Sequence, residues 1–129
     1  MNIEYRDGLL FTDIEISFKG KSKIINNVVV DTGAAQTLIS QDAVDDIGIK
    51  VSGDDEVVTS YGIGEKEHAF VKTIDRVKLG EFVLDNCSLD FTSFQYDDIN
   101  GLIGLDLLIE AGFIIDLKKL KKLKMYLQE

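Results

Sequence analysis

Cysteine, histidine and long apolar stretches are almost missing from this sequence of 129 residues, and each shortage excludes a class of protein. The one cysteine, Cys87, cannot form a disulfide within the chain, which excludes a disulfide-stapled scaffold and fits a reducing compartment. The one histidine, His68, leaves no Cys/His cluster for zinc, and we expect no metal and no cofactor. No apolar run approaches the roughly 20 residues that a membrane-spanning helix needs, and MNIEYRDGLL lacks the features of a signal peptide. We therefore expect a cytoplasmic protein.

Positive charge is also in short supply. The chain has 14 Lys and Arg residues against 23 Asp and Glu residues, a formal net charge of −9. This charge argues against nucleic acid and against an anionic membrane surface as partners. Lysines gather in DLKKLKKLKMYLQE, which fits either an amphipathic membrane helix or a turn followed by a strand, and we favour the strand. With 45% hydrophobic residues, the composition suits one globular domain over residues 1–129.

Most of the chain has the pattern of short strands separated by glycine. Apolar residues alternate through FTDIEISF, and IINNVVV follows it as a second strand. VVTSYGIGEKEHAF and DRVKLGEFVLDNCSLDF are typical of hairpins, the second turning at Gly80. Residues 49–51, FIIDL and LKMYL are further predicted strands. Two short helices are predicted, one capped by Ser40 and ended by Gly48, and one over LDLLIEA that stops near Gly112. The pattern predicts a mainly β, closed or barrel-like domain.

The most informative stretch is VVVDTGAAQTLIS, in which the apolar residues Val28–Val30 run straight into Asp31. A strand that is apolar at successive positions is buried on both faces, so it would carry the aspartate into a poorly solvated site. A lone carboxylate there is costly, whereas two facing carboxylates can share one proton and activate a water. Thr32 can brace the loop through its hydroxyl, and Gly33 can offer its N–H to the carboxylate. The alternative is a plain turn after a core strand.

This segment resembles the active-site loop of retropepsin-like aspartic proteases, in which an apolar strand leads into D-T-G-A or D-S-G-A and a second apolar pair follows. Asp31-Thr32-Gly33-Ala34 and Thr37-Leu38-Ile39 match that order. The family has a second signature, two apolar residues and a glycine before a short helix. Leu102-Ile103-Gly104 followed by LDLLIEAG fits it, about seventy positions downstream. The resemblance implies the acid protease fold, a retropepsin-like closed β-barrel with one or two short helices.

The resemblance also implies an activity and a partner. Only one D-T-G or D-S-G is present, and members of the family with a single motif form homodimers in which each subunit gives one aspartate to a shared site. We therefore expect a homodimeric aspartic endopeptidase that acts on peptide or protein substrates through a water activated by Asp31 of both chains. The residues that shape the catalytic loop would be Thr32, Gly33 and Ala34, and those that support it from behind Leu102, Ile103 and Gly104.

In this family a β-hairpin flap closes over the cleft. The candidate here is TSYGIGEKEHAF, with flap and substrate-binding residues at Tyr61, Gly62, Ile63 and Gly64, and an ordinary surface hairpin fits the same pattern. A second function stays open, because the fold could serve as a non-catalytic peptide-binding or dimerisation module. A nucleophilic Cys87–His68 pair and a cation site at the acidic runs have no motif to support them.

Overall fold

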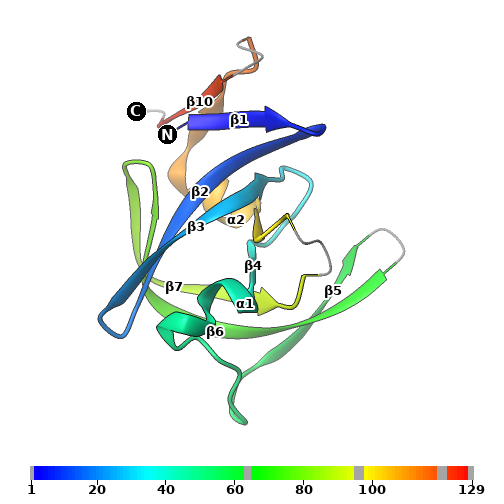
Figure 1. Ribbon diagram of the computed structural model, residues 1–129, viewed down its shortest axis with the longest axis vertical. Helices are drawn as coiled ribbons and strands as arrows, with labels where there is room; N and C mark the ends of the chain where they lie inside the picture. The colour runs from blue at the N-terminus through cyan, green and yellow to red at the C-terminus, as the bar shows by residue number, and fades with distance from the viewer. Residues whose placement is uncertain (1, 63–64, 95–97, 119–121, 128–129) are drawn as a thin grey trace.

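The computed structural model describes residues 2–62, 65–94, 98–118 and 122–127 and shows a mainly β protein (Figure 1). Its strands, in chain order, are β1 (Asn2–Arg6), β2 (Leu9–Phe18), β3 (Lys21–Val30), β4 (Leu38–Ser40), β5 (Val57–Gly62), β6 (Glu65–Leu79), β7 (Phe82–Thr92), β8 (Gly101–Ile103), β9 (Phe113–Ile115) and β10 (Lys122–Leu127). Two short helices interrupt them, α1 (Gln41–Val44) and α2 (Leu105–Ala111). A single turn of 3-10 helix, η1 (Asp45–Ile47), follows α1 directly.

The strands form one sheet in the order β5-β6-β7-β4-β8-β3-β2-β1-β10-β9. β6 also pairs with β2, where Ile16 lies opposite Val77, so the strands from β6 to β2 close on themselves as a ring. The ring supplies one cluster of buried apolar side chains, and its most deeply buried members include Ile14, Ile39, Ile74, Phe91 and Ile103. The mainly β fold with short helices that the sequence predicts is therefore confirmed.

The pairing of three neighbouring strands positions the candidate site. β8 lies between β3 and β4, parallel to β3 and antiparallel to β4. The register pairs Val30 with Ile103, so β3 and β8 end side by side. The residues that follow these two ends, Asp31 and Gly104, belong to the two motifs found in the sequence. The fold therefore brings together segments that lie far apart along the chain.

Glycines end the two helical segments, as the sequence predicts. Gly48 follows η1 in the left-handed conformation, at a φ of 87°, and its N–H donates to the carbonyl of Asp45. Gly112 caps α2 in the same way, at a φ of 66°. Ser40 occupies the N-cap position of α1, but its side chain makes no capping hydrogen bond, so that part of the prediction is wrong.

The remaining predicted elements had mixed outcomes. The LKMYL segment is a strand, as favoured, and β10 pairs with both β1 and β9. The strand predicted over residues 49–51 is wrong, because Ile49 is buried in the core whereas Val51 is mostly exposed and neither pairs with a neighbouring strand. The sequence analysis did not predict β1, which pairs with β10 from the far end of the chain and with the neighbouring β2 (Figure 1). A local signal for it was present, because the turn between β1 and β2 is Asp7-Gly8, with both residues at positive φ. In the part of the chain that the structure describes, no helix is long and apolar enough to cross a membrane.

Gly101 permits the close approach of β8 to β4. A Cβ atom at this position would lie 2.9 Å from the carbonyl oxygen of Leu38 and 2.9 Å from Cδ1 of Ile39. We expect Gly101→Ala to lower the free energy of unfolding by about 1–3 kcal/mol, because the added methyl group overpacks a tight contact with backbone. Urea denaturation measures this change. Gly53→Ala is the matched control, since a Cβ there meets nothing within 4 Å, and an equal loss in both variants would contradict the packing argument.

Candidate active site

The side chain of Asp31 stands at the end of a buried strand. Val28, Val29 and Val30 are all buried, and Asp31 itself is half-buried. Its backbone N–H donates to the carbonyl of Ile103 at 2.9 Å, which extends the pairing of β3 with β8 by one step past the end of β3. The position of the Asp31 backbone is therefore fixed by the ring, whereas its side chain lies in the loop that follows.

The loop after Asp31 orients the carboxylate. The N–H of Gly33 donates to Oδ1 of Asp31 at 2.9 Å, and the N–H of Ala34 donates to the Asp31 carbonyl at 3.1 Å. A Cβ on residue 33 would lie only 3.2 Å from Oδ1, so glycine suits this turn. Among the described residues no donor contacts Oδ2, so this oxygen keeps its capacity to accept a proton or a water. Thr32 is exposed, and Ala34 is half-buried.

The second motif supports this loop from behind. Ile103 is fully buried, Gly104 is buried and Leu102 is half-buried. A Cβ on residue 104 would lie 2.7 Å from backbone atoms of Gln36 and 2.8 Å from the carbonyl oxygen of Ala34, so only glycine fits here without a shift of the loop. The first motif and the second are therefore packed backbone to backbone.

Hydrogen bonds join the start of α2 to the same loop. The N–H of Leu105 donates to the carbonyl of Ala34 at 2.8 Å, and the N–H of Asp106 donates to the carbonyl of Ala35 at 3.2 Å. These amides belong to the first turn of α2, which has no partners for them within the helix. The helix thus uses its unpaired N-terminal amides to hold the loop that carries Asp31.

A buried polar contact between Thr37 and Asp106 completes the support. Thr37 is 1% exposed, and its hydroxyl donates to Oδ1 of Asp106 at 2.6 Å while its N–H donates to Oδ2 at 3.0 Å. The same hydroxyl oxygen accepts the N–H of Gly104 at 3.1 Å. One threonine side chain thereby connects the segments of the two motifs. Thr37 and Asp106 lie 69 positions apart in the sequence.

The sequence analysis assigned no role to Asp106, although this residue lies in the LDLLIEAG segment of the second signature. A signal was present, because Asp106 lies in the first turn of a predicted helix, where an acidic side chain interacts favourably with unpaired amides. Its bond to Leu107 N–H, 2.9 Å long, is of this kind. Its bond to Thr37 depends on the packing of two distant segments and has no local signal.

The expected flap residues lie on a separate element. Tyr61 and Gly62 are the last residues of β5 and pair with Lys66 and Glu65 of β6. Ile63 and Gly64 lie outside the described residues. The hairpin formed by β5 and β6 extends to one side of the ring, the side on which the loop between β3 and β4 also lies (Figure 1).

In the described part of the chain, the side chains of Cys87 and His68 do not assemble into another centre. Cys87 is buried, and burial raises the pKa of its thiol, with the negative charges of Asp106 and Glu110 adding to the effect. A thiol with a raised pKa is a poor nucleophile at neutral pH. His68 contacts Thr59 through Nδ1 at 3.3 Å. Within the described ranges, no group of His, Cys, Asp and Glu side chains is arranged to hold a metal ion.

Removal of the Thr37 hydroxyl tests the support of the loop. We expect Thr37→Val to lower the free energy of unfolding by about 1–3 kcal/mol, because the buried N–H of Gly104 and the carboxylate of Asp106 each lose a partner. Thermal or urea denaturation measures the loss. Thr73→Val is the matched control, because the Thr73 hydroxyl contacts only the exposed hydroxyl of Ser88. If Thr37→Val were as stable as that control, the contact would have no supporting role.

Comparison with known proteins agrees with this geometry. Residues 14–107 match the family described as aspartyl protease, and this match spans most of the chain. Among solved structures, the chain is similar to a retropepsin-like aspartic protease from Rickettsia conorii, with a TM-score of 0.67 and 21% sequence identity over 95% of this chain and 86% of that chain. None of the curated protein sequences matches the chain. The structural likeness shows a retropepsin-like fold, and by the family match the chain belongs to the aspartyl protease family.

Proposed function

We propose that this protein is a homodimeric aspartic endopeptidase in which Asp31 of each chain contributes one carboxylate to a shared site. The observation that carries the proposal is the Asp31 loop itself. A half-buried carboxylate, oriented by the N–H of Gly33, stands at the end of a buried strand in a chain of the aspartyl protease family. Such a carboxylate is held in place but keeps one oxygen available for chemistry.

The chemistry follows from two carboxylates that face each other. Two carboxyl groups at close range cannot both ionise easily, because their negative charges repel. The pair therefore holds one proton between them. The ionised carboxylate takes a proton from a water as that water attacks the scissile carbonyl carbon, and the protonated carboxylate gives its proton to the carbonyl oxygen. Collapse of the resulting tetrahedral diol breaks the C–N bond. The leaving nitrogen takes up the proton of the pair, and one diol hydroxyl gives its proton to an ionised carboxylate as the new C=O forms. The products are a carboxylic acid and an amine, and the pair again holds one proton.

The second carboxylate has to come from a second copy of the chain. The sequence contains one D-T-G and no D-S-G. Asp106 of the same chain also contacts the loop, but both of its carboxylate oxygens already accept hydrogen bonds from Thr37. Thr32 and Gly33, beside Asp31, are exposed in the single chain, as residues that meet a partner must be. A two-fold axis beside this loop would bring the two Asp31 side chains together.

The other residues of the site have supporting roles in this proposal. Thr32, Gly33 and Ala34 shape the catalytic loop, and Leu102, Ile103 and Gly104 hold it from behind. The hairpin of β5 and β6, which includes the predicted flap residues Tyr61 to Gly64, covers a bound peptide. The assignment of the flap rests on the resemblance and on the hairpin extending to the side of the ring on which the Asp31 loop lies (Figure 1). A single domain over residues 1–129 and a cytoplasmic location stay predictions.

Replacement of the catalytic carboxylate is the direct test. We expect Asp31→Asn to lower the rate of cleavage of a peptide mixture at mildly acidic pH by roughly 10²–10⁴-fold, because the amide can act neither as base nor as acid in the pair. Mass spectrometry of the products measures cleavage, and circular dichroism shows whether the fold is retained. Asp13→Asn, an exposed aspartate on β2, is the control. Cleavage that persisted in Asp31→Asn would sink the assignment, and a folded wild type without cleavage of any peptide would favour the non-catalytic binding module.

Mixed dimers test whether the site is shared. When an equal amount of Asp31→Asn is added to a fixed amount of wild type, free exchange of chains places half of the wild-type chains in mixed dimers. We expect cleavage to fall to about half, because a mixed dimer holds only one Asp31. Addition of an unrelated protein at the same mass is the control. Unchanged cleavage, with chain exchange demonstrated by differently tagged subunits, would show that each chain carries a complete site.

A further inference from the structure

The hairpin of β5 and β6 is weakly packed at its base. Among the described residues β5 is an edge strand, and its one partner strand there is β6. Val57, its first residue, is 63% exposed, and Val51 in the preceding loop is 58% exposed. An open pocket of about 210 Å³ lies between these valines and the side chains of Phe70 and Phe91. Apolar burial therefore contributes little to holding the first arm of the hairpin in place.

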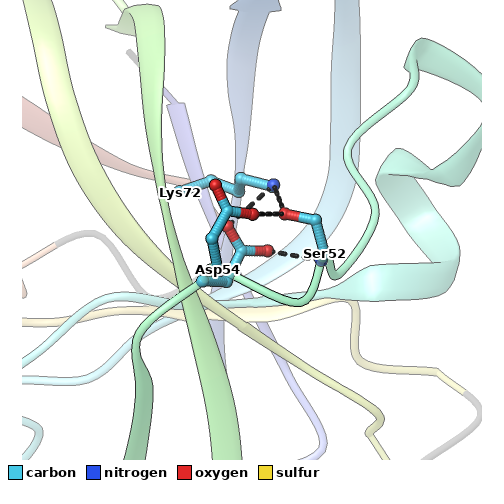
Figure 2. A network of polar contacts seen from close by, with 4 residues as sticks. Ser52, Asp54 and Lys72 are labelled. Carbon is cyan, nitrogen blue, oxygen red and sulfur yellow. Dashed lines mark hydrogen bonds and ion pairs between the residues drawn. The ribbon is translucent and has the colours of Figure 1, made fainter.

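A polar cluster occupies the same region and connects the loop before β5 to β6. Lys72 Nζ donates to Oδ1 of Asp55 at 2.9 Å and to the hydroxyl of Ser52 at 3.1 Å. The Ser52 hydroxyl donates to Oδ1 of Asp54 at 3.0 Å, and the Ser52 N–H donates to Oδ2 of Asp55 at 2.7 Å. Figure 2 shows the side chains of Ser52, Asp54 and Lys72 pointing toward one another. We call these four residues the hairpin latch.

The central ion pair of the latch is much less exposed than the other ion pairs of the described chain. The side chains of Lys72 and Asp55 are 18% and 11% exposed, whereas those of Arg76 and Asp85 are 56% and 59% exposed. Shielded pairs with several hydrogen bonds fix geometry far better than exposed ones, which water and salt weaken. Both cations belong to β6, so the strand offers a shielded pair and an exposed pair for comparison.

Backbone contacts show what the latch holds. The N–H of Asp55 donates to the carbonyl of Ser52 at 3.1 Å, and the N–H of Val71 donates to the carbonyl of Glu56 at 2.9 Å. The loop is thus folded on itself and attached to β6 just before β5 begins. On its other side the chain leads back to Ile49, which is fully buried in the core. The latch therefore joins the core, the loop and the second arm of the hairpin at one point.

We propose that Lys72, through Asp55 and Ser52, is a positioning residue that sets how the hairpin of β5 and β6 stands relative to the candidate site, and hence how readily a peptide binds there. This proposal rests on the function proposed above for its effect on catalysis. The hydrogen bond from Lys72 also holds the pKa of Asp55 below its ordinary value. An aspartate is already ionised in the mildly acidic range where an aspartic peptidase works, and the lowered pKa extends the ionised state of Asp55 to more acidic pH.

The test compares Lys72→Met with Arg76→Met, which removes the same charge from the same strand. Amide hydrogen exchange measures the latch without any need for activity. We expect Lys72→Met to speed exchange in Val57–Gly62 by roughly tenfold or more while the ring strands keep their protection, because only the hairpin loses its anchor. Arg76→Met is expected to leave exchange in that strand unchanged, and Lys72→Arg, which keeps the charge, is expected to restore slow exchange.

Kinetics then test the link to function. If the latch raises the fraction of chains with the hairpin correctly placed, its loss raises KM by roughly tenfold and leaves kcat within about twofold. Unchanged exchange in Val57–Gly62, or faster exchange throughout the chain, would overturn the latch as a local anchor. Faster hairpin exchange with an unchanged KM would overturn its positioning role. A wild type that cleaves no peptide would count against the proposed function alone, because the exchange measurement still decides whether the latch exists.

Discussion

The parallel pairing of β3 with β8 is the constraint on which the rest of the site depends. It places the end of one buried strand beside the end of another, so that Asp31 and Gly104 follow at the same level. Backbone groups just past the end of each strand pair with the segment of the other. The N–H of Asp31 donates to the carbonyl of Ile103, and the amides that begin α2 donate to the carbonyls of Ala34 and Ala35. The Asp31 loop is thereby shaped by backbone hydrogen bonds, which demand little from its side chains.

Two residues, Gly104 and Thr37, contribute to the support of the loop through the size or the hydroxyl group of the side chain. Gly104 is required because a Cβ would strike backbone at 2.7 Å, and Thr37 is required because its hydroxyl serves both Asp106 and the amide of Gly104. A buried carboxylate is costly unless its oxygens find donors. Asp106 is partly buried, and the hydroxyl and N–H of Thr37 provide two such donors. The contact thereby favours one arrangement of the two motifs.

Local signals in the sequence predicted the parts of this fold that depend on residues close together in the chain. The valine run and D-T-G predicted a strand that ends at Asp31, and glycine predicted the ends of η1 and α2. Contacts between distant segments could not be predicted in this way. The Thr37–Asp106 bond joins residues 69 positions apart, and β1 pairs with β10 from the other end of the chain. The contacts of Lys72 with Ser52 and Asp55 had no local signal either, since nothing near these residues in the sequence indicates that Lys72 lies beside them.

One strand belongs to both the ring and the hairpin. The last residues of β6 pair with β2 and close the ring, whereas its first residues pair with β5 and extend beyond it. Successive side chains of a strand point to opposite faces, so the register of β6 against β2 fixes which of its side chains face the core. A residue added to the outer half of β6 leaves that register in place only if it is taken up within the hairpin or in a bulge, as the register shift between Thr12 and Ile14 is in the pairing of β2 with β3. The ring therefore fixes the inner end of the hairpin, and its length can vary only at the outer end.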